Sequence, residues 1–172
     1  LWLSAGTVGG ENNLRKEAEA RGVQPDRIIF AKNIPHTSHL ARLQLADIAL
    51  DAYYHSGGVT TTDAIWAGLP ILTVAGPTPS AQTGVSVLKA ARLPELITYS
   101  LDEYEKQLHH LAGNREELAK IRSRMTSTRD EVPLFDSQRL ARLLELGYNM
   151  MWEQYEAGLE PKGFDIPAIS QV

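Results

Sequence analysis

The sequence of 172 residues contains no cysteine. Disulfide bonds, thiolate metal ligands and a cysteine nucleophile are therefore excluded. No apolar run approaches the roughly 18 residues that a membrane-spanning helix needs, so no membrane partner is predicted. No basic segment is followed by an apolar stretch, as a signal peptide would require. These absences favour a cytoplasmic protein.

A strong excess of charge is also missing. The chain has 17 Lys and Arg against 21 Asp and Glu, a net charge of −4, and its basic residues are scattered. A nucleic-acid binder usually carries a basic stripe, so nucleic acid is not expected as a partner. No pair of histidines four residues apart combines convincingly with a carboxylate, so no metal site and no metal cofactor are predicted.

What the sequence does contain is an alternation of short apolar runs with amphipathic stretches. Strands are predicted at residues 1–4, 27–30, 48–50 and 71–74, and helices at residues 12–21 and 36–47. The run at 71–74 is almost wholly apolar, which is typical of a strand buried on both faces. This pattern predicts an α/β fold, in which a Rossmann-like parallel sheet is flanked by helices.

The second half of the chain is predicted to be helical. Capping residues mark the beginnings of four helices, namely Thr78, Ser100, Asn114 and Asp136. The last helix extends toward Tyr155, and the residues after Gly158 look extended. We therefore predict one lobe with a helical C-terminal extension over residues 1–158, followed by a tail over 159–172.

The loop between the third and fourth predicted strands is the most informative segment. It contains Gly57, Gly58 and the three consecutive threonines 60–62, and the chain is predicted to continue as a helix from Asp63. Glycines let a backbone approach a ligand closely, and a helix N-terminus favours an anion such as a diphosphate. The alternative from residue types alone is that the threonines only cap the helix and Asp63 favours its dipole.

A second candidate site precedes the predicted helix at residues 36–47. His39 and Arg42 are three residues apart and share a helix face. An imidazole and a guanidinium can enclose and hydrogen-bond a flat base. The alternative is an ordinary surface pair at a helix start.

Together these residues resemble the nucleotide-binding core of the protein O-GlcNAc transferases. The resemblance runs in order along nearly the whole chain, through the segments 27–30, 44–47, 50–51, 66–68, 133–135 and 151–158 together with Pro35, His39, Arg42, Gly57, Thr60, Asp63 and Pro70. It implies one lobe of a GT-B fold, with the donor in a cleft between two Rossmann-like lobes, no essential metal and inversion at the anomeric carbon.

The resemblance also implies roles for individual residues. The residue matching His39 packs against uracil with Arg42 beside it, and the backbone around Asn33 and Ile34 reads the base edge. The helix start matching Thr60 holds the diphosphate, and the carboxylate matching Asp63 holds the ribose. Gly57, Gly58, Thr61 and Thr62 complete the expected nucleotide-sugar site.

The chain departs from the family at two places. Animal members have His-Thr-Thr where this chain has Gly58-Val59-Thr60, and a lysine often follows the proline where this chain has His36. A related branch combines a threonine-rich version of this loop with GDP-fucose.

The expected function is that of the donor-binding lobe of a protein O-glycosyltransferase, which transfers GlcNAc from UDP-GlcNAc to Ser or Thr hydroxyls of a protein acceptor. The alternatives are a GDP-fucose or UDP-hexose transferase of the same architecture, or a non-catalytic nucleotide-binding module. The sequence begins inside an apolar run, so we expect an N-terminal catalytic lobe, associated with TPR-type helical repeats, to be missing. The chain alone is then expected to be an inactive fragment, and no catalytic residue is assigned.

Overall fold

The computed structural model describes residues 1–4 and 6–168. The chain divides into two compact units, Leu1–Arg42 and Leu43–Val172, and each is described by itself. The boundaries predicted from the sequence, 1–158 and 159–172, stay a prediction.

The first unit is a small parallel βαβ arrangement. Its elements are β1 (Trp2–Ser4), α1 (Val8–Ala20), a 3-10 helix η1 (Pro25–Arg27), β2 (Ile29–Ala31) and the greater part of α2 (His36–Leu43). β1 and β2 pair in parallel, with Leu3 opposite Phe30. α1 begins four residues earlier than predicted, because the hydroxyl of Thr7 accepts a hydrogen bond from the Gly10 N–H at 3.2 Å and caps the helix there. Gly22 follows the helix with a φ of 77°, a left-handed conformation that suits glycine.

The second unit contains a three-stranded parallel sheet in the order β3-β4-β5. The sheet elements and the helices between them are β3 (Ala49–Leu50), α3 (Val59–Trp66), β4 (Ile71–Val74), η2 (Pro79–Gln82), α4 (Thr83–Ala90), η3 (Pro94–Leu96) and β5 (Ile97–Thr98). The helical second half follows with α5 (Leu101–Gly113), α6 (Arg115–Ser127), η4 (Arg129–Glu131), η5 (Pro133–Phe135) and α7 (Ser137–Glu156).

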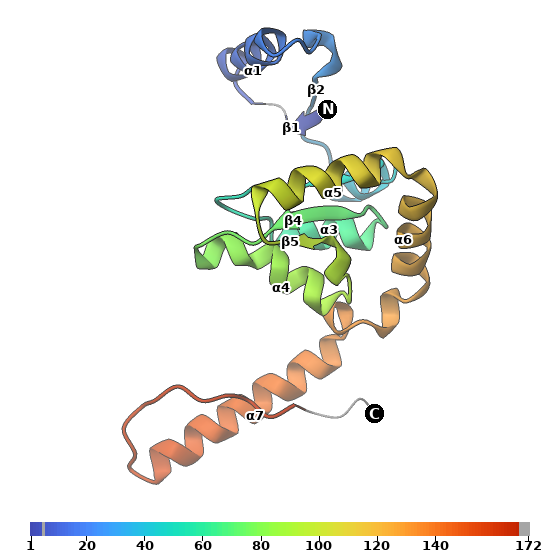
Figure 1. Cartoon of the computed structure of the whole chain (residues 1–172). Coiled ribbons are helices and arrows are strands. Elements are labelled where there is room, and N and C mark those ends of the chain that lie inside the picture. Colours follow the sequence, from blue (N-terminus) through green and yellow to red (C-terminus); the bar gives the residue numbers. More distant parts are fainter. Residues whose placement is uncertain (5, 169–172) are drawn as a thin grey trace. The chain divides into compact units, whose positions relative to one another are not determined.

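β4 lies at the centre of this unit. All four of its residues are buried, as its apolar sequence predicted. α5 covers one face of the sheet and α3 and α4 cover the other (Figure 1). Apolar side chains from these helices and from α6 join β4 in a single core that includes Ile65, Leu72, Leu88, Leu111 and Ile121. The predicted α/β class, a Rossmann-like parallel sheet flanked by helices, is confirmed.

The four predicted capping residues lie where they were expected. Each accepts a hydrogen bond from a backbone N–H three residues further on, at 2.8–3.3 Å, and these residues are Thr78, Ser100, Asn114 and Asp136. Thr78 begins a short 3-10 helix that leads into α4. Each cap satisfies one of the unpaired amides of a first helical turn. The helices therefore begin in the structure at the positions that the sequence predicted.

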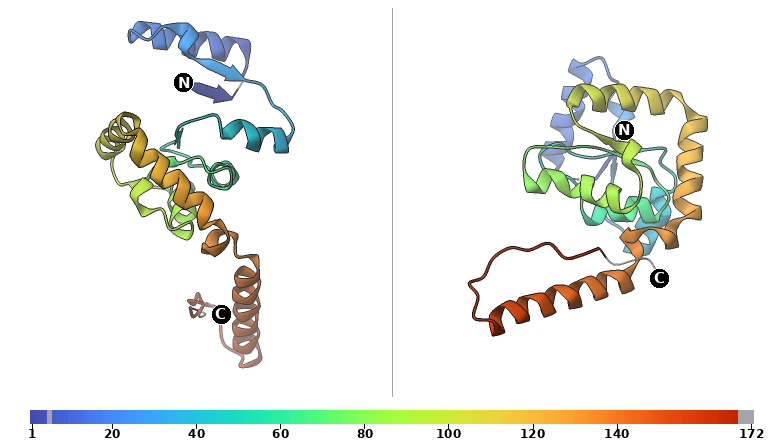
Figure 2. Two further views of the ribbon diagram at one scale, coloured as in Figure 1. Left: turned by 90° about the vertical axis from the view of Figure 1, so that its right-hand side faces the viewer. Right: turned by 60° about the horizontal axis from the view of Figure 1, so that its bottom comes forward.

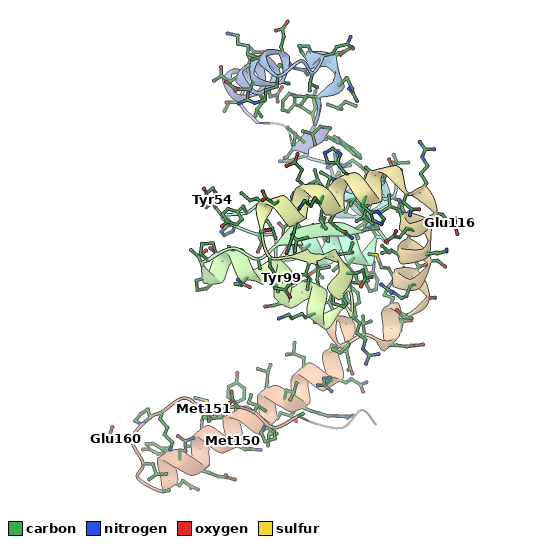
Figure 3. All side chains as sticks on the ribbon, viewed as in Figure 1. Tyr54, Tyr99, Glu116, Met150, Met151 and Glu160 are labelled. Atoms are coloured by element: carbon green, nitrogen blue, oxygen red, sulfur yellow. The ribbon has the colours of Figure 1, made fainter. Side chains whose placement is uncertain are left out.

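α7 is the long final helix, and the residues after Gly158 return alongside it (Figure 2). Ile166 from this returning segment lies against Gly147, where a β-carbon would come within 2.9 Å of its side chain. An exposed apolar stripe remains on α7 and includes Leu144, Tyr148 and Met151. Figure 3 shows Met150 and Met151 on this helix.

Two elements differ from the sequence predictions. β5 was missed, because it is only two residues long and follows a proline-initiated turn. α2 was predicted to continue to residue 47 but ends at Leu43. The carbonyls of Gln44 and Ala46 instead accept hydrogen bonds from the Arg122 guanidinium, at 3.1 and 2.7 Å.

Leu88→Ala should lower the free energy of unfolding by about 2–5 kcal/mol, because the Leu88 side chain is 0% exposed at the centre of the core. Urea unfolding followed by circular dichroism measures the change. Leu45→Ala is the matched control, since Leu45 is 81% exposed and its truncation should change stability by less than about 0.5 kcal/mol. Equal losses in the two variants would contradict the placement of the core.

Candidate functional site

The carboxyl ends of the parallel strands in the second unit lead into three loops, and ligands of open α/β sheets bind at this edge. The loop after β3 runs from Asp51 to Gly58, the loop after β4 leads to Thr78, and Tyr99 follows β5. Figure 3 labels Tyr54 on the first of these loops and Tyr99 on the third. Tyr54 is 80% exposed, and its ring meets that of Tyr53 edge to face at 5.0 Å.

α3 begins without a side-chain cap. Its N-cap residue is Gly58, so the threonines lie inside the helix, and none of them occupies the N-cap position of the capping alternative. The first N–H groups of a helix have no partner one turn back, and here no side chain caps them. The start of α3 is therefore an uncapped helix N-terminus, which favours an anion.

The three threonines differ in what their side chains do. The Thr61 and Thr62 hydroxyls donate to the carbonyls of Gly57 and Gly58, at 2.8 and 3.1 Å. Thr61 is fully buried, and its hydroxyl therefore holds the turn together from inside. Thr60 is exposed and lies on the first turn of α3.

Gly57 is required where it stands. A β-carbon at this position would overlap the Thr60 hydroxyl and lie 2.6 Å from the Thr61 hydroxyl. The Gly57 N–H donates to the Asp51 carboxylate at 2.8 Å. Gly57 thus contributes a close approach of the backbone, while its own amide is used within the loop.

Asp51 is the residue that the sequence analysis did not single out. Its Oδ1 accepts hydrogen bonds from the N–H groups of Ala52 and Gly57, at 2.9 and 2.8 Å, and its Oδ2 accepts one from the Thr73 hydroxyl at 2.5 Å. The signal that would have found it is Thr73, a polar residue within an otherwise apolar buried strand, because a buried hydroxyl needs a partner.

Tyr104 on α5 also contacts this residue. Its hydroxyl donates to the backbone carbonyl of Asp51 at 3.2 Å. Burial of the phenol, with a further contribution from the negative charge of Asp51, raises the pKa of Tyr104 to about 12. The phenol therefore keeps its proton and its hydrogen bond at neutral pH.

Asp63 is the fifth residue of α3 and is half-buried. Its position, one turn after the helix start, is the one that the sequence predicted. Its ribose-binding role, like the ligand-binding roles of Gly57, Gly58, Thr60, Thr61 and Thr62, stays a prediction.

In the first unit, His39 and Arg42 contact each other as their spacing predicted. Arg42 Nη2 lies 2.8 Å from His39 Nδ1, and Nη1 donates to the Lys32 carbonyl at 2.8 Å. The Arg42 guanidinium also lies over the Trp2 ring, 5.4 Å from its centroid. Because a guanidinium only donates, a neutral His39 accepts at Nδ1 and carries its proton on Nε2. The pair therefore offers an N–H donor and a flat ring held in place by Arg42.

Asn33 and Ile34 lie in the connection between β2 and α2, and both are exposed. α2 begins directly after Pro35, whose carbonyl accepts a hydrogen bond from the His39 N–H at 2.9 Å. The role of the backbone of these two exposed residues in reading a base stays a prediction.

Residues 1–4 and 6–168 include no group of three or more His, Asp or Glu side chains placed to hold a metal ion. Over the same residues, the structure has no helix that combines the length and the apolar character needed to cross a membrane.

Comparison with known proteins relates this chain to one family. Residues 1–144 match the family model described as glycosyl transferase family 41. The chain belongs to this family. A relative from Arabidopsis thaliana, "Probable UDP-N-acetylglucosamine--peptide N-acetylglucosaminyltransferase SEC", is 35% identical over 167 residues, which cover 96% of this chain and 17% of the relative. The Caenorhabditis elegans "UDP-N-acetylglucosamine--peptide N-acetylglucosaminyltransferase" is 31% identical over 159 residues, covering 92% and 14%.

A solved structure supports the same assignment. A point mutant of the Thermobaculum terrenum O-GlcNAc transferase superposes with a TM-score of 0.81 at 28% sequence identity, covering 86% of this chain and 28% of that one. The resemblance to the O-GlcNAc transferases and the GT-B type of fold are thereby confirmed. The chain spans less than a fifth of the length of the two curated relatives.

The pKa of Tyr104 predicts a stability change at high pH. The unfolded chain releases this proton near the ordinary value of 10.0, and the folded chain releases it near 12. The contribution of Tyr104 to stability is therefore complete below pH 10 and is lost as the pH rises toward 12. Ultraviolet titration of the wild type minus Tyr104→Phe should show a tyrosinate step near pH 12. A difference step near pH 10 would contradict the burial of this phenol.

Proposed function

We propose that this chain is the donor-binding part of a protein O-glycosyltransferase, which transfers GlcNAc from UDP-GlcNAc to Ser or Thr hydroxyls of a protein acceptor with inversion. Membership of family 41 and the names of both curated relatives support this proposal. A nucleotide sugar and a protein acceptor are then the partners, and the nucleotide sugar is a substrate rather than a cofactor.

The observation that carries the proposal is the uncapped N-terminus of α3. Gly58 brings no side chain to this end of the helix, and Thr60 on the first turn is exposed. We assign the diphosphate to these backbone amides and to the Thr60 hydroxyl, because a helix N-terminus combines N–H donors with a favourable dipole. Asp63, one turn further on, is assigned to the ribose hydroxyls.

The base is assigned to the pair in the first unit. His39 supplies a ring surface and an Nε2–H donor, and Arg42 fixes the orientation of that ring through the 2.8 Å contact at Nδ1. The base edge is assigned to the backbone polar groups of Asn33 and Ile34, two exposed residues.

Chemistry requires more than donor binding. An inverting transfer needs a base or proton relay for the acceptor hydroxyl, and it needs stabilisation of the negative charge on the leaving diphosphate. The α3 amides supply the second of these. We assign the first to a further catalytic lobe, so the chain alone is proposed to bind donor without turnover, and no catalytic residue is named within it.

One observation favours a second donor. Gly58 and Val59 stand where animal members carry a histidine and a threonine, and both lack a polar side chain. A GDP-fucose or UDP-hexose transferase is therefore the second candidate, and a non-catalytic nucleotide-binding module is the third. Calorimetric titration with UDP, GDP and their sugar conjugates separates these donors directly.

Asp63→Asn should weaken UDP binding by about 1–3 kcal/mol, the range for hydrogen bonds to charged groups. If the carboxylate accepts hydrogen bonds from both ribose hydroxyls, the same substitution should matter much less for the 2′,3′-dideoxy analogue. Calorimetry with both nucleotides and both proteins measures the difference. A loss that is the same with and without the diol would make Asp63 a structural residue.

His39→Ala should weaken UDP binding by about 1 kcal/mol or more, because a stacking partner is lost. His109→Ala is the matched control, since His109 lies on α5 with its side chain 79% exposed, 3.9 Å from Glu105. This second substitution should leave the affinity unchanged. Equal affinities of the two variants would remove His39 from the site.

A further inference from the structure

Asp51 lies at the junction of two loops and a strand in the second unit. Its two carboxylate oxygens accept hydrogen bonds from three donors, two on the loop that follows it and one on β4. Gly57 lies near the far end of that loop. The hydrogen bond from its N–H to Asp51 therefore joins the two ends of the segment between Asp51 and Gly57. The next residue is Gly58, the N-cap of α3.

The start of α4 packs against the same carboxylate. A β-carbon at Gly84 would overlap Asp51 Oδ2 and lie 2.8 Å from the Thr73 hydroxyl. Only a residue without a side chain fits there, so the partly buried carboxylate packs between β4, the loop and α4.

Ser56 joins the two loops at this point. Its hydroxyl accepts from the Gly84 N–H and donates to the Ser80 carbonyl, both at 2.9 Å, and its own N–H donates to the same carbonyl at 3.1 Å. Ser56 is 2% exposed. The loop after β3 is therefore anchored at Ser56 and at Gly57, immediately before the helix start.

We propose that Asp51 is a positioning residue for the diphosphate site, which it serves by fixing the Gly57-Gly58 backbone and hence the direction of the first α3 amides. This inference rests on the proposed function. Asp51 acts through the loop and does not touch the ligand, since its carboxylate is occupied by N–H and O–H donors of the protein. A carboxylate in contact with a diphosphate would repel it, so the benefit comes from geometry and not from charge.

Two substitutions at this position separate geometry from charge. Asparagine keeps an Oδ1 acceptor for the Gly57 N–H, and its Nδ2 amide can donate to the Thr73 hydroxyl, which reverses the hydrogen bond that Thr73 donates to Asp51 in the wild type. Alanine removes the carboxylate, so the Ala52 N–H, the Gly57 N–H and the Thr73 hydroxyl all lose their acceptor. Thr98→Val is the matched control, because Thr98 is buried on the neighbouring strand and its hydroxyl donates to the Thr73 carbonyl at 2.9 Å, away from the loop.

The experiment uses the full chain and has two readouts for each protein, calorimetric Kd for UDP and hydrogen exchange of the Gly57 amide by NMR without nucleotide. We expect Asp51→Ala to raise Kd at least 10-fold and to speed exchange at Gly57 at least 10-fold. Asp51→Asn should stay within about threefold of the wild type in both readouts. Thr98→Val should lower the melting temperature and leave Kd unchanged.

Several results would overturn the inference. Unchanged exchange at Gly57 in Asp51→Ala would show that the carboxylate does not hold the loop. Faster exchange with an unchanged Kd would show that the loop does not position the site, and an equal loss of affinity in Asp51→Asn would assign the effect to charge. If the wild type binds neither UDP nor GDP, the proposed function itself fails, and the exchange data still report whether Asp51 holds the loop.

Discussion

A hydroxyl buried in the central strand of a sheet has to be hydrogen-bonded, and this requirement organises the second unit. Thr73 is fully buried in β4, and its Oγ1 reaches the Asp51 carboxylate at 2.5 Å. The carboxylate in turn has further acceptor capacity, which the loop amides fill. A polar group in the core thereby determines where the loop after β3 begins and where it ends.

The other buried polar side chains extend the same arrangement. The buried polar residues of the described chain are Ser56, Thr61, Thr73 and Thr98, and each donates a hydrogen bond within the second unit. All of them belong to β4, β5 or the loop and helix start that follow β3. Because buried hydrogen bonds are costly to leave unmade, those of Ser56, Thr61 and Thr73 hold the loop after β3 and the start of α3 in one conformation before any ligand arrives. The hydrogen bond of Thr98 instead joins β5 to β4.

The sequence allowed the fold class and the helix starts to be predicted, because both depend on local signals. An apolar run at 71–74 identified the buried strand, and residues such as Asn114 and Asp136 marked helix starts through a hydrogen bond that spans three residues. The two-residue strand β5 has no such local signal. Just after the end of α2, the Ala46 carbonyl accepts a hydrogen bond from Arg122, which is 76 residues away in the sequence and gives no local signal.

The two candidate segments, one in each unit, were predictable to different extents. His39 and Arg42 contact each other through helical spacing, so their pairing followed from the sequence. The threonines looked equivalent, yet Thr61 is buried and Thr60 is exposed, a difference that only the packing of α3 reveals. Asp51 was not identified as part of the site, because its partners are brought together from the loop and from β4 by the fold.

An uncapped helix N-terminus has a further consequence if α3 binds the diphosphate as proposed. Negative charge on the diphosphate grows as the bond to the sugar breaks, so fixed amides stabilise the transition state more than the intact donor. The same amides then face the UDP product, whose charge is greater than that of the donor. A rigid loop that improves departure of the leaving group therefore also strengthens product binding, and the anchoring of Gly57 by Asp51 would affect both.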